Sequence, residues 1–169
     1  MPLRSIPGWF RSNVSILRRV IGLVEVLGAG WSVVGLGGLF LRSGAVMPWS
    51  FLFIFLGSYT FVGLAGVLLL RQHRLGEPLS ILAQVPQLVQ LTSGALAYRF
   101  IAGYQVTLFL VGDRFGAYAG LSAAINLWRG TNDPAFMLGV NLIPVVLLAL
   151  LVLLPTSGNH ARPLAGEAS

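Results

Sequence analysis

Few side chains in this sequence could do chemistry, and the most prominent of them is Glu25. It is the single acid in a long apolar run, Val20 to Leu41. An acid inside a membrane segment costs about 2.5–3.5 kcal/mol on insertion scales. Glu25 could therefore be a proton or cation site. It could also be a shallow carboxylate that is hydrated from the interface or paired with Arg18, which shares its helix face. The second interpretation is favoured, because Glu25 lies near the basic end of the run.

Three amides, Gln84, Gln87 and Asn141, complete the candidate polar intramembrane site. The two glutamines could line a polar groove, or they could mark the wet side of an interfacial helix. Asn141 precedes Pro144 and could form a substrate or ion site at a broken helix, as in transporters. More often such an asparagine caps the kink or bonds to a neighbouring helix. A small oligomeric transporter or channel would use these residues together with Glu25.

Patterns of known catalytic chemistry are missing from the sequence. There is no cysteine, and both histidines, His73 and His160, lie outside the apolar runs. Paired carboxylates, a His cluster, a GxSxG turn and a phosphate-binding glycine loop are all absent. We therefore expect a non-catalytic protein with no catalytic residue, no metal site and no cofactor.

Small residues form a second set of candidates, a predicted helix-packing interface. Small side chains let helix backbones approach closely in lipid, where hydrophobicity cannot drive association. The interface could be with a partner subunit, with a second copy, or between the chain's own first and second spans. Its members are Gly28, Ser32, Gly35, Gly38, Gly63 and Gly66.

The elements that must position these residues are predicted to be membrane helices. The chain is 56% hydrophobic and 9% charged, with a mean hydropathy of +0.82, whereas a soluble domain is about 25% charged. About 20 apolar residues in a helix match a hydrocarbon core of about 30 Å. Three stretches qualify, at about 20–41, 49–70 and 136–154. We therefore predict an all-α integral membrane protein, a small polytopic helical bundle with three transmembrane helices.

Residues 75–133 are an ambiguous insert. Residues 78–91 look like an amphipathic helix, and 117–128 like another amphipathic or interfacial helix. Between them, residues 94–111 alternate with period two, which is typical of a β-hairpin, with Ala102-Gly103 as its turn. A fourth span, imperfectly apolar and broken by Arg99 and Gln105, is the alternative. The arginine distribution favours three spans with a cytoplasmic N-terminus and the C-terminus outside.

These observations predict an accessory or scaffolding subunit of the bacterial inner membrane, without catalysis. Residues 1–19 would be a cytoplasmic, Arg-rich interfacial segment, 20–155 the transmembrane bundle and 156–169 a disordered tail. The expected partners are the lipid bilayer and either other membrane subunits or a second copy. Nucleic acid is not expected, because the arginines lie at the ends of the apolar runs. The small transporter or channel is the alternative function.

Overall fold

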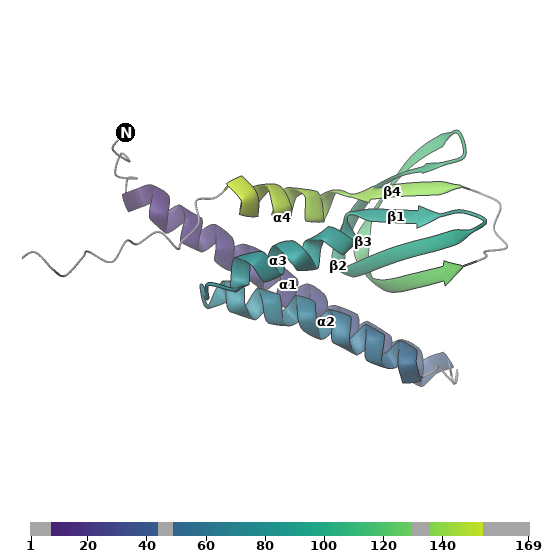
Figure 1. Cartoon of the computed structure of the whole chain (residues 1–169), viewed down its shortest axis with the longest axis horizontal. Coiled ribbons are helices and arrows are strands. Elements are labelled where there is room, and N and C mark those ends of the chain that lie inside the picture. Colours follow the sequence, from purple (N-terminus) through teal and green to yellow (C-terminus); the bar gives the residue numbers. More distant parts are fainter. Residues whose placement is uncertain (1–7, 44–48, 130–135, 154–169) are drawn as a thin grey trace, which may run out of the picture.

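The computed structural model describes residues 8–43, 49–129 and 136–153. About 60% of these residues are helical and about 30% lie in a four-stranded antiparallel sheet (Figure 1). The elements in chain order are α1 (Gly8–Ser43), α2 (Trp49–Leu70), α3 (Gly76–Gln84), the 3-10 turn η1 (Val85–Gln87), β1 (Val89–Thr92), β2 (Leu96–Val111), β3 (Arg114–Arg129), β4 (Met137–Asn141) and α4 (Leu142–Leu153).

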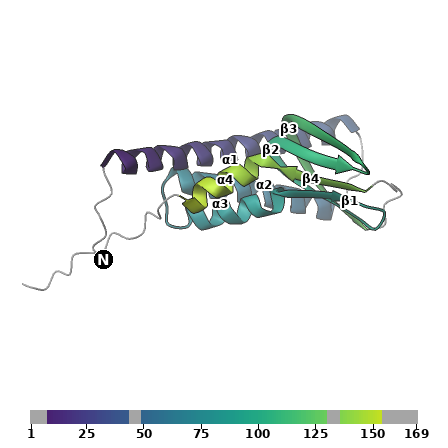
Figure 2. The same ribbon diagram turned by 90° about the horizontal axis from the view of Figure 1, so that it is seen from above.

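Two long apolar helices, α1 and α2, lie side by side and antiparallel (Figures 1 and 2). Of the described residues, two segments are long and apolar enough to cross a membrane: Asn13–Gly38 and Trp49–Leu70. The second segment has the predicted bounds. The two helices approach closely where Gly22 faces Gly66, because a Cβ added at either glycine would lie 2.6 or 2.7 Å from the other's carbonyl oxygen.

The predicted third span, residues 136–154, is wrong. Its described part holds strand β4 and then helix α4, which has 12 residues. At 1.5 Å per residue, α4 is about 18 Å long and cannot cross a hydrocarbon core of about 30 Å. Hydropathy does not distinguish an apolar strand followed by a short helix from one continuous helix. The all-α bundle with three spans is therefore corrected to two span-length helices and a mixed α/β remainder.

The insert contains strands where helices were expected. The fourth-span alternative and the interfacial helix over 117–128 are both wrong, because β2 and β3 pair residue for residue from Leu96↔Arg129 to Val111↔Arg114. The hairpin turns at Gly112, with φ of +60°, and not at Ala102-Gly103. The helix expected over 78–91 ends early, since β1 begins at Val89.

The sheet closes on itself through strands distant in sequence. Its order is β1-β4-β2-β3, and β1 pairs with β2 as well. The first half of β2 pairs with β1, as at Leu91↔Tyr98, and its second half pairs with β4, as at Leu108↔Val140. This needs a sharp bend in β2, which occurs at Gly103, with φ of +95°. Only glycine adopts that backbone conformation readily.

The bend of β2 is pressed against the middle of α1. A Cβ added at Gly103 would lie 2.4 Å from the Cα of Gly28, and one added at Gly28 would lie 2.7 Å from the carbonyl oxygen of Ala102. Beside this contact the ring of Tyr59 on α2 stacks on Phe100, and its hydroxyl donates to the carbonyl of Ile101 at 3.2 Å. The core between the helix pair and the sheet is centred here.

We expect Gly28→Ala to destabilise the protein by about 1–3 kcal/mol, because the new methyl group meets backbone that cannot move aside. Gly30→Ala is the matched control on the same helix: no atom lies within 4 Å of its added Cβ, and alanine favours a helix by about 1 kcal/mol over glycine. Thermal unfolding of the two variants in detergent measures the difference. Equal midpoints would show that the contact at Gly28 is not close.

Candidate functional site

Glu25 lies at the junction of three helices, and its side chain is 2% exposed. Ser80 Oγ donates to one carboxylate oxygen at 2.7 Å, and Gln84 Nε2 donates to the other at 2.8 Å. Both donors come from α3, where residues four apart share a face. On the third side is Gly66 of α2, where an added Cβ would lie 2.8 Å from the Cβ of Glu25. Both carboxylate oxygens are therefore used to hold α3 against the helix pair.

Arg18 pairs with Glu77 rather than with Glu25. The distance from Arg18 Nη2 to Glu77 Oε2 is 2.7 Å, and both side chains are largely buried. Glu77 lies in the first turn of α3, where a negative charge also interacts favourably with the helix dipole. Helix α3 is therefore held to α1 by two contacts: the Arg18–Glu77 ion pair and the hydrogen bonds from Ser80 and Gln84 to Glu25.

The other two amides of the candidate polar site serve other junctions. Gln87 donates to the carbonyl of Ala83 and accepts from the backbone N–H of Ala102, each at 3.0 Å, so it links η1 to β2. Asn141 is fully buried, and its Oδ1 accepts from the backbone N–H groups of Val106 and Ile143, both at 3.2 Å. The bond from Ile143 is an N-cap for α4. The structure therefore brings Gln84 to Glu25 but places Gln87 and Asn141 apart from it.

Pro144 does not kink a longer helix. It is the third residue of α4, within the first turn, where a helix makes no use of the backbone N–H that proline lacks. Together, Asn141 and Pro144 mark the start of a helix rather than the break of a longer one.

The predicted packing glycines divide into contacts within this chain and open positions. Gly66 contacts α1 at Gly22, and an added Cβ at Gly63 would lie 3.4 Å from the Cβ of Ala29. Both therefore belong to the α1–α2 interface.

The four small residues on the C-terminal half of α1 do not act together. Gly28 contacts the β2 bend at Gly103, and the buried Ser32 donates its hydroxyl to the Gly28 carbonyl at 2.8 Å. At Gly35 the nearest atom to an added Cβ is 3.9 Å away, and at Gly38 there is none within 4 Å. The small-residue pattern predicts contact with another helix, but Gly28 contacts strand β2.

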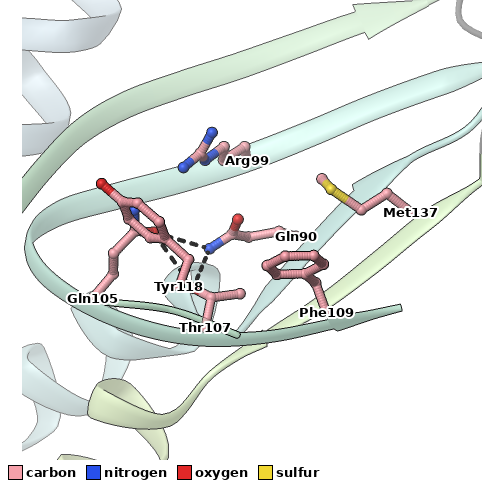
Figure 3. Close-up of a pocket in the computed structure, with 7 residues that line it drawn as sticks. All are labelled: Gln90, Arg99, Gln105, Thr107, Phe109, Tyr118 and Met137. Atoms are coloured by element: carbon pink, nitrogen blue, oxygen red, sulfur yellow. Dashed lines mark hydrogen bonds between the residues drawn. The ribbon is translucent and has the colours of Figure 1, made fainter. Parts of the chain in front are cut away.

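Sequence reasoning missed a half-open cavity in the curl of the sheet, lined by both polar and apolar side chains. Its volume is about 390 Å³, and Figure 3 shows β2 curving around it with side chains pointing inward. Arg99 and Gln105 had signalled only that a fourth span would be broken. The available signal was the period-two pattern, which puts Arg99, Gln105 and Thr107 on one side of β2. This cavity is called the sheet cavity below. Its lining residues are Gln90, Arg99, Gln105, Thr107, Phe109, Tyr118 and Met137.

Comparison with known proteins found no matching family model, no matching curated protein and no matching solved structure.

Replacing Glu25 should reveal a structural carboxylate. Glu25→Ala leaves Ser80 and Gln84 as buried donors without a partner, and each such group costs about 1–3 kcal/mol. In Glu25→Gln the amide oxygen can accept from Gln84 while its NH₂ donates to the Ser80 hydroxyl. We therefore expect a large loss of stability for Ala and a loss of about 1 kcal/mol or less for Gln, measured by unfolding in detergent. Equal losses in the two variants would contradict the geometry.

Proposed function

We propose that this protein is a non-catalytic, accessory subunit of a bacterial plasma-membrane complex, held in the bilayer by α1 and α2. Its role is to pack against another membrane subunit and so contribute to assembly. The key observation is that a long strand, β3, has one edge that no other described strand pairs with, and that it lies beside helices of membrane-spanning length.

The outward faces of the helix pair support membrane insertion. Leu27 is 64% exposed and Val34 69% on α1, and Phe53 is 70% exposed on α2. Polar side chains of the same helices, such as Glu25 and Ser32, are turned inward and hydrogen bonded. A membrane-spanning helix pair needs apolar side chains on its outer face and hydrogen-bonded polar side chains in its interior.

Arginines support an orientation with the N-terminus in the cytoplasm. In the sequence, most of the arginines that flank the two apolar runs come before the first run or after the second, whereas Arg42 is the one arginine between the runs. Basic residues that flank spans remain on the cytoplasmic side. Those at the proposed cytoplasmic end are Arg4, Arg11, Arg18, Arg19, Arg71 and Arg74.

The free edge of β3 is the reason for expecting a protein neighbour. Among the described residues β3 pairs with β2 alone, and large side chains near its start are exposed, Phe115 by 73% and Tyr118 by 49%. Soluble edge strands are usually protected by lysine, proline or a bulge, but the charged residues of β3 are at its two ends, Arg114 and Arg129. Where this edge lies within the hydrocarbon region, each unpaired backbone group costs several kcal/mol, and pairing with a second backbone removes that cost.

One outward-facing backbone group on this edge can be identified. The N–H of Val106 donates to Asn141, so it points away from β3. Opposite residues of an antiparallel pair either exchange both hydrogen bonds or make none. Val106 is opposite Ala119. The N–H of Ala119 therefore points to the free edge, where a partner strand would accept it.

The transport alternative has less support from the contacts. Its four residues do not line one path, because Gln87 and Asn141 hold the sheet and α4 while Glu25 has both oxygens occupied. A proton or cation flux in liposomes that contain this protein alone, lost in Glu25→Gln, would favour transport instead.

The proposed orientation predicts that reporters fused at opposite ends of the α1–α2 helix pair give opposite signals. A reporter inserted between Ser43 and Trp49 should be periplasmic, and one inserted at Gln72, between α2 and α3, should be cytoplasmic. The protein should also stay with the membrane after washing at alkaline pH. Extraction by that wash, or the same signal from both insertions, would contradict a two-span hairpin.

Association should depend on the Ala119 N–H. Ala119→Pro removes this donor and leaves the β2–β3 hydrogen bonds in place, whereas Ala119→Val keeps the donor and favours a strand. The mass of the complex purified in mild detergent should exceed that of one chain in the wild type and in Ala119→Val. It should fall to one chain in Ala119→Pro.

A single chain in all three samples would refute the accessory role. A complex that persists in Ala119→Pro would move the interface elsewhere on the protein. Mass spectrometry of the wild-type complex distinguishes a second copy from another subunit.

A further inference from the structure

The sheet cavity contains two buried donor atoms that no described residue satisfies. Gln105 is fully buried, and its Nε2 has no hydrogen-bond partner; the buried Nε of Arg99 has none either. Unpaired buried donors are rare in folded proteins, and each one calls for an explanation. Both residues line the same cavity, so a bound acceptor would explain both atoms.

The amide of Gln105 is oriented by its neighbours. Gln90 Nε2 donates to Gln105 Oε1 at 3.3 Å and to Thr107 Oγ1 at 3.0 Å, and Thr107 donates to the same Oε1 at 3.4 Å (Figure 3). With its oxygen engaged by these two residues, Gln105 has its NH₂ group left to donate. Gln90 and Thr107 are themselves buried, so this donor is fixed in position before any ligand arrives.

The charge of the cavity is one-sided. Arg99 is the single charged residue of the lining, and no carboxylate among the described residues pairs with it. A guanidinium group presents donors and no acceptor, and carboxylate and phosphate oxygens are its best partners. The polar end of the cavity therefore selects an anionic oxygen group.

The opposite end of the cavity is apolar. Figure 3 shows Phe109 and Met137 on the side away from Gln105. The ring of Phe109 lies over Gly116, where an added Cβ would be 2.5 Å from the ring. A larger side chain at position 116 would therefore displace the Phe109 ring from its place in the cavity lining.

We propose that the sheet cavity binds one small anionic amphiphile, with a carboxylate or phosphate headgroup on Arg99 and Gln105 and a short apolar chain against Phe109 and Met137. Taking about 30 Å³ for each water-sized group, the cavity holds about a dozen non-hydrogen atoms. That is the size of a medium-chain fatty acid or of the equivalent alkyl phosphate. The proposal does not depend on the accessory role.

The test is calorimetric titration of the full-length protein in a nonionic detergent, with the heat from protein-free micelles subtracted. Octanoate and octyl phosphate carry the two headgroups on one tail. Octanol keeps the tail without the charge, and acetate and inorganic phosphate keep the charge without the tail. We expect saturable binding of one octanoate or one octyl phosphate per chain, and at least roughly tenfold weaker binding of octanol, acetate and phosphate. The tighter of the two alkyl probes identifies the headgroup.

Three variants assign the site. Arg99→Gln should weaken binding roughly tenfold or more, whereas Arg114→Gln, an exposed arginine outside the cavity, should leave it unchanged. Gln105→Glu keeps an acceptor for Gln90 and Thr107 but brings a carboxylate to Arg99, so it should abolish anion binding. Its unfolding temperature should be equal to or above that of the wild type, which separates lost binding from lost folding.

Several results would overturn the proposal. Octanol binding as tightly as octanoate would show that the anion is not recognised. Unchanged affinity in Arg99→Gln or in folded Gln105→Glu would place the ligand elsewhere. No saturable binding of any probe to the folded wild type would mean that the cavity holds only water.

Discussion

A buried carboxylate determines how the rest of this protein is assembled. Glu25 lies on a helix whose outward side chains are mostly apolar, so both of its carboxylate oxygens need partners that cannot come from lipid. Ser80 and Gln84 supply them, and Arg18 with Glu77 repeats the connection two turns earlier along α1. α3 must therefore lie along the helix pair. Because η1 and β1 follow directly, the sheet starts beside the middle of α1, where Gly28 and Gly103 allow the close approach.

The sequence predicted two span-length helices, because a long apolar run is a strong and local signal. The bounds of the second span were correct, whereas the first, predicted at 20–41, is Asn13–Gly38 within one longer helix, Gly8–Ser43. The sequence also indicated strands over residues 94–111, through the alternation of Tyr98, Phe100 and Ala102 with Arg99 and Ile101. It did not predict that β2 continues through Gly103. Whether Ala102-Gly103 is a turn or a bend depends on what lies against it, and that is α1, some 75 residues away in the chain. The same limit explains the error over residues 136–154, where the local hydropathy is the same for a strand followed by a helix as for a span.

Only part of the candidate site could be predicted, because its other contacts join residues that are distant in the chain. Glu25 stands out in any hydropathy reading, and Gln84 was grouped with it correctly in space, although no local pattern shows that α3 folds back along α1. Arg99 and Gln105 were seen only as flaws in a fourth span. Their meaning depends on the curl of the sheet, which brings the two halves of β2 to face each other across the cavity (Figure 3). Polar residues that weaken one structural interpretation can thus be the functional residues of another.

The closed ring of strand pairs sets an order of events during synthesis. β1 and the first half of β2 can pair as soon as they leave the ribosome, but the gap between β1 and the second half of β2 is filled by β4. β4 ends about 30 residues after β2, which at about 5–20 residues per second is a delay of about 2–6 s. For that time the nascent chain presents an open slot with two backbone edges. Until β4 pairs there, a strand from another nascent chain can pair with the same two edges.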